Sequence, residues 1–508
     1  MQLFKSAKRK ILITALLIFL LSLILRVYQL EDIYVFNFDE EYQATYAWTL
    51  VKDPHPIWIG VSSSFLDFYL GPYFTYFTAI LLGLSHGNPM ITAYFAAIVG
   101  AITTTVIFLI GWKAFDYKAG MIASFLYATM PVFVFFDQKY WNTMFSNLIA
   151  VLLFFVIILI KKNKWWWLLY AALFGIVLET HLMPAPLLLV GFIYFFIGKY
   201  FKDVKLFLAC VAVFLLFYWP LIVFDVNHNF SNLTIFSRFT SGVSESKVAF
   251  DPGAKFNTLF DSMGRLWYLK PGNPNADEIN FGCTSLSVKP ELKFIDQYAK
   301  RTYASPLLST LTLILLLLFL YKSFKDKKSE NKLLSIYLLV TLSAFMAFPG
   351  GSSEYYTLTL LTLFLFVPGI LIGQLNTKFQ LPAICAILII GIMGINTIIN
   401  TSDEFSLGPK KELISKVMTV VGNESFALDG RGVCHDYEGW RYLFKVYGRL
   451  PSQSYTDKNL GWLYPEEIDK NPPAYTVIMS EDRIPLKEDL SSLQSFKEGG
   501  YKAYIRKN

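Results

Sequence analysis

The chain has 508 residues, of which 54% are hydrophobic and 16% are charged, and its mean hydropathy is +0.44. Soluble domains carry about a quarter charged residues, so this composition excludes a soluble globular enzyme and indicates helices that lie in a bilayer. The formal net charge of +7 does not indicate a nucleic-acid partner, because the basic residues cluster in short loops between apolar runs.

The apolar runs predict an all-α polytopic membrane protein with about eleven transmembrane helices. The first run, Ile11–Leu30, follows a basic N-terminus, and at about 20 residues it is long enough to span a bilayer. No small-residue cleavage site follows it, so we expect an uncleaved first span. The run Trp165–Ile197 is too long for one span, and we divide it in two around His181–Pro186.

The lysine positions predict the orientation of these spans. Short basic loops alternate with more acidic ones along the chain, and the positive-inside rule places the basic loops and the N-terminus in the cytoplasm. The expected cytoplasmic turns are Lys113–Lys118, Lys161–Lys164, Lys199–Lys205, Lys322–Lys332 and Thr377–Gln380. We therefore expect a plasma-membrane protein whose first loop (31–89) and long loop (225–301) are external.

The last hundred or so residues differ from the membrane domain expected over residues 1–400, because charged residues return. Short strand-like runs at Ser425–Leu428, Tyr475–Met479 and Tyr501–Ile505 flank a helix-like stretch near Trp440–Tyr447. This pattern predicts a small external α/β domain over residues 401–508. The segment Asp436–Trp440 partly resembles an acceptor-binding motif of oligosaccharyltransferases, but the preceding tryptophans are absent, and we interpret it as a helix start.

The four cysteines do not form a disulfide framework. Cys210 and Cys385 lie inside apolar runs and are expected in the core. Cys283 and Cys434 both fall on the expected external side, so a bridge between them stays an open alternative.

Three adjacent carboxylates, Asp39, Glu40 and Glu41, follow the first span directly. Such groups repel one another and are costly near lipid, so at least one of them should have a function. The alternative is a helix N-terminus, where acidic residues complement the helix dipole. That alternative explains Glu40 and Glu41 better than Asp39.

Further polar residues are expected at the same external rim, each with a structural alternative. Asp67 lies among aromatic residues of the first loop and could be a solvated loop carboxylate. Asp137 and Lys139 end the third span and could pair with each other. His181 lies between two apolar runs, where an ionisable residue suggests function, but it could be a satisfied helix-end histidine. Tyr355 begins the tenth span and could be an interface anchor.

A metal site at the external rim is an open alternative. Asp39, Asp67 and His181 could together bind a divalent ion, but no tight ligand spacing supports such a site. A divalent metal ion therefore stays an open alternative, and no other cofactor is expected.

Several of these residues carry a family resemblance. The Asp39-Glu40 pair after the first span, the short turn after Pro131, Trp141-Asn142 at the rim and His181 beyond the next helices resemble the GT-C membrane glycosyltransferases. The closest resemblance is to glycosyltransferase family 39, whose members include protein mannosyltransferases and bacterial aminoarabinose transferases. The resemblance covers roughly residues 8–200 well and the C-terminal domain hardly at all.

The resemblance implies a transferase that uses a polyprenyl-phosphate-linked sugar as donor and a glycan, lipid or protein as acceptor on the extracytoplasmic face. It places Asp39 and Glu40 in the catalytic motif, with Asp39 as the general base that deprotonates an acceptor hydroxyl. Lys139 or Arg301 would contact the departing phosphate. The expected substrate-binding residues are Asp67, Asp137, Lys139, Asn142, His181, Arg301 and Tyr355.

Two other classes of membrane protein compete with the transferase. A flippase or secondary transporter of lipid-linked sugars would tend to show internal repeats and helices broken at midplane, and neither is evident in the sequence. A polymerase or ligase of surface polysaccharide would need a long basic external loop, whereas loop 225–301 has mixed charge. The one-sided clustering of polar residues favours the transferase.

Overall fold

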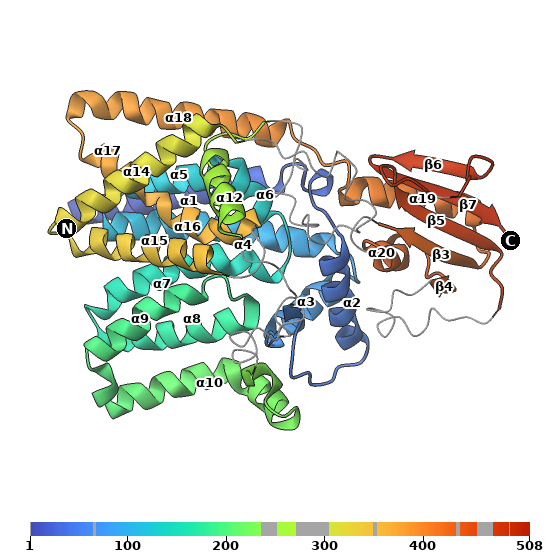
Figure 1. The fold of residues 1–508 in the computed structure, drawn as a ribbon, viewed down its shortest axis with the longest axis horizontal. Coiled ribbons are helices and arrows are strands. Elements are labelled where there is room, and N and C mark those ends of the chain that lie inside the picture. Colours follow the sequence, from blue (N-terminus) through green and yellow to red (C-terminus); the bar gives the residue numbers. More distant parts are fainter. Residues whose placement is uncertain are drawn as a thin grey trace.

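The computed structural model describes residues 2–63, 68–234, 251–270, 304–348, 353–432, 437–454, 471–486 and 488–508. A bundle of long helices occupies most of the molecule, and a small sheet domain is attached to the end of the bundle opposite the N-terminus (Figure 1). The protein is thus an all-α polytopic membrane protein with a C-terminal α/β domain, as predicted from the sequence.

The helices of the bundle follow the predicted spans. They are α1 (Gln2–Val27), α4 (Met90–Ala114), α5 (Tyr117–Thr129), α6 (Pro131–Asp137), α7 (Ser146–Ile160), α8 (Trp167–Thr180), α9 (Ala185–Ile197), α10 (Val204–Asn227), α14 (Pro306–Lys325), α15 (Ser329–Ala347), α16 (Leu358–Phe364), α17 (Phe366–Gly373) and α18 (Thr377–Ile399). The shorter elements that connect these helices are η1 (Leu30–Asp32), α2 (Phe38–Lys52), β1 (Ser62–Ser63), β2 (Phe68–Tyr69), α3 (Tyr73–Leu84), η2 (Asn142–Phe145), η3 (Lys164–Trp166), η4 (Tyr200–Lys202), α12 (Pro252–Arg265) and η6 (Glu354–Thr357).

Length and hydropathy divide these helices into two groups. Within the described ranges, seven helices are long and apolar enough to cross a membrane, and an eighth span results if the bent pair α5–α6 is counted as one. The three remaining predicted spans are α8, α9 and α15. The first two have only 14 and 13 residues, so each reaches about 20 Å, less than the hydrocarbon core of about 30 Å. The third begins with the polar residues Ser329–Lys332.

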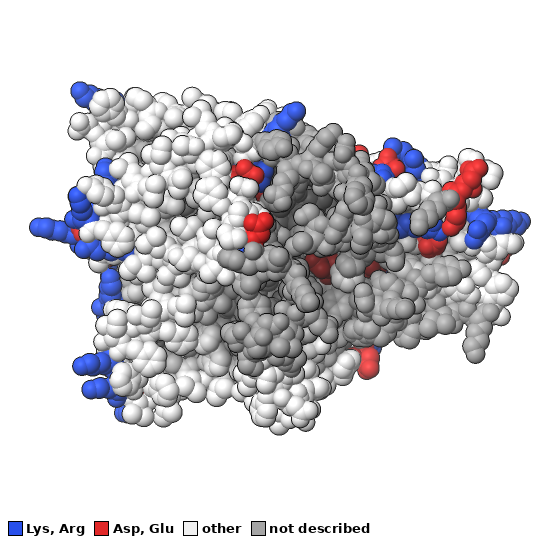
Figure 2. Space-filling view, viewed as in Figure 1, with Lys and Arg blue, Asp and Glu red and all other residues white. Residues whose placement is uncertain are grey.

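The basic loops lie together at one end of the bundle. The Lys10 ammonium stands 4.7 Å from the centre of the Tyr117 ring at the start of α5. Lys118 donates a 2.7 Å hydrogen bond to Gln380 at the start of α18. The space-filling view shows lysine and arginine concentrated at the end of the bundle away from the sheet domain (Figure 2).

A sharp break separates α5 from α6. The two helices meet at an angle of 65°, and Pro131 opens α6 at a position where its missing N–H leaves no hydrogen bond unmade. At the other end of α6, Asp137 accepts hydrogen bonds from Arg26 Nε at 2.8 Å and from the Tyr127 hydroxyl at 3.2 Å. This buried ion pair fastens α6 to α1, which fixes the rim residues that follow.

The C-terminal domain is a five-stranded mixed sheet in the order β4-β3-β5-β7-β6. Its elements are α19 (Leu407–Val421), β3 (Phe426–Arg431), α20 (Trp440–Tyr447), β4 (Gln453–Ser454), β5 (Tyr475–Glu481), β6 (Gln494–Glu498) and β7 (Tyr501–Lys507). In the central register Leu428 lies opposite Val477, which lies opposite Ile505, and all three are buried. The three predicted strands and the helix starting at Trp440 are confirmed, whereas α19, β4 and β6 were not predicted.

Backbone contacts join this domain to the segment that follows α1. The Leu407 N–H donates to the Tyr34 carbonyl at 2.8 Å, and the Asp403 N–H donates to the Asp32 carbonyl at 2.7 Å. Gly439, just before α20, has a φ of +90°, and a Cβ at this position would lie 2.5 Å from the carbonyl oxygen of Phe36. The domain therefore lies directly against the chain that leads into α2.

This close approach generates a stability prediction. Gly439→Ala should lower stability by about 1–3 kcal/mol more than Gly422→Ala, because overpacking adds to the left-handed backbone strain. Gly422 is the matched control, since its φ is +54° but no atom lies within 4 Å of an added Cβ. Thermal unfolding of both variants in detergent measures the difference, and equal melting temperatures would contradict the contact.

Candidate active site at the start of helix α2

Helix α2 begins with the three adjacent carboxylates. The N–H of Asn37, the residue before the helix, donates to Glu40 Oε2 at 3.1 Å, the interaction of a capping box. Asp39, Glu40 and Glu41 thus occupy the first turn, where negative charge complements the helix dipole. The helix N-terminus that the sequence left as an alternative is confirmed.

The three carboxylates have different surroundings. Glu40 is buried and its Oε1 lies 3.1 Å from the Lys139 ammonium; burial raises the pKa of Glu40, while Lys139 opposes that rise. Glu41 is buried and accepts the N–H groups of Gly439 at 3.2 Å and Tyr442 at 3.0 Å. Asp39 is exposed, and no described residue donates a hydrogen bond to it. Of the three carboxylates, only Asp39 is exposed and without a hydrogen-bond donor among the described residues.

A row of aromatic contacts runs from Lys139 to His181 along the same rim. The Lys139 ammonium lies 4.9 Å from the centre of the Trp141 ring, and Trp141 meets Tyr355 edge-on at 4.9 Å. His181 contacts Tyr355 at 6.3 Å between ring centres. Asp39 is joined to this row through its neighbour in the chain, Glu40, whose carboxylate binds Lys139. The structure therefore brings together four predicted site residues, Asp39, Lys139, His181 and Tyr355.

His181 is held as a neutral ring. Its Nδ1 accepts the N–H of Met183 at 3.0 Å, so the proton of the neutral ring is on Nε2. Burial lowers the pKa of His181 to about 4, so the ring carries no charge near neutral pH. His181 can thus donate one hydrogen bond to a ligand but does not serve as a cation.

Other predicted site residues are placed differently. The alternative in which Asp137 pairs with Lys139 is not the one observed, because Asp137 binds Arg26 and Lys139 binds Glu40. Asp137 is buried in that ion pair, so its carboxylate is occupied by Arg26 rather than offered to a substrate. Asn142 opens η2 next to Trp141 and is half-buried.

Four residues singled out from the sequence lie outside the described ranges. They are Asp67, Arg301, Cys283 and Cys434. The predicted roles of Asp67 and Arg301, and the alternative of a disulfide, stay predictions. Among the described residues, no group of three His, Cys, Asp or Glu side chains is arranged to hold a metal ion, and a metal site that includes Asp67 stays open.

Two buried ion pairs near the rim were missed from the sequence. Arg26 is the partner of Asp137, and its position inside the first apolar run is a signal that could have been used, because charges in spans have partners. Arg265 donates to both carboxylate oxygens of Glu354 at 3.0 and 2.9 Å, immediately before Tyr355. No local sequence pattern indicates that second pair, since its members come from α12 and η6.

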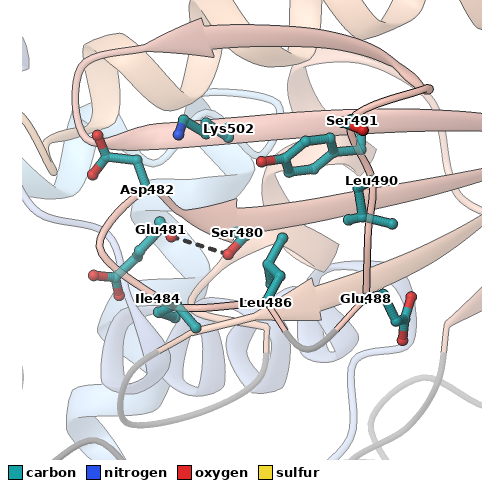
Figure 3. Close-up of a pocket in the computed structure, with 10 residues that line it drawn as sticks. Ser480, Glu481, Asp482, Ile484, Leu486, Glu488, Leu490, Ser491 and Lys502 are labelled. Carbon is teal, nitrogen blue, oxygen red and sulfur yellow. Dashed lines mark hydrogen bonds between the residues drawn. The ribbon is translucent and has the colours of Figure 1, made fainter.

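A cavity of about 250 Å³ lies elsewhere, on the sheet domain (Figure 3). Residues from the end of β5 to Ser491, together with Lys502 and Tyr504, line it. None of the rim residues takes part in it. Each of its three carboxylates pairs with a basic side chain, Glu481 with Arg483, Asp482 with Lys497 and Glu488 with Arg431.

Comparison with known proteins supports the family resemblance. The family model described as dolichyl-phosphate-mannose-protein mannosyltransferase matches residues 70–224. No curated protein sequence shows significant similarity to the chain.

Solved structures extend the likeness over nearly the whole chain. ArnT from Cupriavidus metallidurans bound to undecaprenyl phosphate has a TM-score of 0.57 at 9% identity, with 98% of each chain covered. The apo state of ArnT from the same organism gives a TM-score of 0.59 at 10% identity, also with 98% of each chain covered. AglB, the oligosaccharyltransferase of Archaeoglobus fulgidus in complex with an inhibitory peptide and a dolichol-phosphate, has a TM-score of 0.50 at 13% identity, covering 94% of this chain and 70% of AglB. The chain therefore shares its fold with ArnT over nearly its whole length, and the part matched by the family model, residues 70–224, lies inside the helical bundle.

The Glu40–Lys139 pair generates a second stability prediction. Lys139→Met should lower the free energy of unfolding by about 3 kcal/mol, because it leaves a buried carboxylate without its cation. The double variant Lys139→Met with Glu40→Gln should recover most of this loss. Thermal unfolding in detergent measures both, and equal stabilities of the single and double variants would contradict the pairing.

Proposed function

We propose that the protein transfers a sugar from a polyprenyl-phosphate-linked donor to a hydroxyl of a glycan, lipid or protein on the extracytoplasmic face. The observation that carries this proposal is the exposed Asp39 carboxylate on the first turn of α2, next in the chain to Glu40, which binds the buried Lys139 ammonium. A general base must be free to accept a proton and close to where negative charge develops. Asp39 meets both conditions, whereas Glu40 and Glu41 have partners.

The chemistry of this step follows from the placement of the charges. Asp39 takes the proton of the acceptor hydroxyl as its oxygen attacks the anomeric carbon of the donor sugar. The bond between that carbon and the phosphate oxygen breaks, and polyprenyl phosphate leaves with the electron pair. Because Asp39 is exposed, it can return the proton to water. Glu40 is better placed to orient Lys139 than to act as a second base.

Recognition of the donor is assigned to the rim residues next to Asp39. Lys139 is a point charge suited to a phosphate oxygen, and it lies over the Trp141 ring. Trp141 and Tyr355 supply aromatic faces and His181 a single donor at Nε2. Asn142 and Asp67 are proposed as further sugar contacts, and Arg301 as a second phosphate contact, on the family resemblance alone.

The orientation of the protein follows from its basic end. On the bundle, lysine and arginine gather at the end away from the sheet domain (Figure 2), and loops rich in these residues remain in the cytoplasm. The N-terminus would then be cytoplasmic, and α2 with the C-terminal domain would face the outside of the plasma membrane. A lipid-linked donor in the outer leaflet would reach Asp39 with its chain still in the bilayer.

The first test replaces the base. Asp39→Asn should leave the protein folded and inserted but lower transfer at least about 100-fold, the usual contribution of a general base. Asp53→Asn, at the opposite end of α2 with a side chain 90% exposed, is the matched control and should keep full activity. Mass analysis of surface glycans and glycolipids from cells that carry each variant provides the measurement.

Two outcomes would contradict the proposal. Full activity of Asp39→Asn would remove this residue as the base. Movement of labelled lipid-linked sugar across proteoliposomes without any transfer product would instead indicate a flippase.

The second test concerns the aromatic row. Tyr355→Ala should raise the KM for the donor about threefold to tenfold, because an aromatic contact contributes about 0.5–1.5 kcal/mol. Tyr355→Phe keeps the ring and should keep the KM. Equal effects of both substitutions would indicate that the hydroxyl, and not the ring, is what the donor needs.

A further inference from the structure

Lys410 joins the C-terminal domain to the start of α2. This side chain of α19 is fully buried, and its ammonium donates to the carbonyl of Phe36 at 2.8 Å, to Asn37 Oδ1 at 2.9 Å and to the carbonyl of Glu438. The rings of Trp440 and Tyr501 lie 5.1 and 5.0 Å from it. A buried ammonium is costly unless all its N–H groups are paired, and here three acceptors match its three donors.

Glu41 makes the reverse connection, from α2 to the C-terminal domain. Its two carboxylate oxygens accept the N–H groups of Gly439 and Tyr442, which belong to the N-terminal end of α20. Those groups have no partner within their own helix, and a carboxylate there also meets the positive end of the helix dipole. The C-terminal domain thus contributes the Lys410 ammonium to the start of α2, and α2 contributes the Glu41 carboxylate to the start of α20.

The two connections bracket Asp39. Asn37 and Glu41 are one helical turn apart, so they lie on the same side of α2, and Asp39 falls between them in the chain. A third connection, Glu40 with Lys139, ties the same turn to the helical bundle. The turn that carries the free carboxylate is therefore fastened on both sides, while Asp39 itself is not engaged by any described donor.

We propose that Lys410 and Glu41 are positioning residues, which hold the first turn of α2 against the C-terminal domain and so fix Asp39 relative to Lys139 and Tyr355. This inference rests on the proposed function of Asp39. The C-terminal domain is then part of the catalytic geometry and not a passive cover. Neither residue touches the substrate, so their loss changes the rate of the chemical step and not the affinity for the donor.

The test compares Lys410→Met and Glu41→Ala with Lys416→Met, a control on the same helix whose exposed ammonium pairs with Glu498. The two test variants should lower kcat about tenfold to 100-fold, because small misplacements of a catalytic group are costly, and should leave the KM for the lipid-linked donor within about twofold. Glu41→Gln keeps the shape and one acceptor oxygen, and its kcat should lie between those of the wild type and Glu41→Ala. Lys416→Met should match the wild type.

Hydrogen exchange of the full-length protein in lipid nanodiscs provides a readout that does not depend on activity. The amides of Gly439 and Tyr442, whose N–H groups donate to Glu41, should exchange at least about tenfold faster in Glu41→Ala. Those at the start of α2 should exchange faster in Lys410→Met, while Lys416→Met should leave both regions unchanged. Glu41→Gln preserves the volume of the side chain at this position. Its kcat therefore still tests the proposal if Lys410→Met fails to fold.

The failures of the two proposals are distinguishable. Unchanged exchange in Lys410→Met and Glu41→Ala would overturn the docking itself. Faster exchange with an unchanged kcat would show that docking does not position the base, and a raised KM with an unchanged kcat would assign these residues to binding. A wild-type protein that shows no transfer would overturn the proposed function, whereas the exchange rates would still report whether the domain holds α2.

Discussion

Pairing of buried charge at the first turn of α2 is the constraint on which the site depends. Glu40 and Glu41 are both buried, and a buried carboxylate without a partner costs several kcal/mol. Glu40 is satisfied by Lys139 from the bundle, and Glu41 by two backbone N–H groups of the C-terminal domain. The bundle, α2 and the sheet domain must therefore meet in one arrangement, and in that arrangement Asp39 is the carboxylate left over.

The helical bundle positions Lys139, the partner of Glu40. Lys139 reaches Glu40 because the chain turns by 65° between α5 and α6 and because the Arg26–Asp137 pair holds the end of α6 against α1. The shape of the rim thus rests on an ion pair that takes no part in the proposed chemistry. The fold is shared with ArnT at 9% identity, so the arrangement of the helices is retained although most side chains differ.

Sequence reasoning predicted the features that depend on local pattern. Apolar runs predicted the spans, and short strand-like runs predicted β3, β5 and β7. It did not predict which charges pair, because Arg26 and Asp137 are 111 residues apart and Glu41 and Tyr442 are 401 apart. Asp39, Glu40 and Glu41 look alike in the sequence, and only tertiary packing separates their roles. Lys410 was missed for the same reason, since a lysine in a charged helix is usually solvated.

The missing side chain at Gly439 has a consequence for how such a protein can diversify. Its α-carbon faces the Phe36 carbonyl with no room for a Cβ, so the contact between the two domains is made there by backbone against backbone. A contact between two backbones does not depend on the identity of the side chains around it. The loops and outer strands of the sheet can therefore accumulate substitutions while the distance from the sheet to the first turn of α2 stays the same.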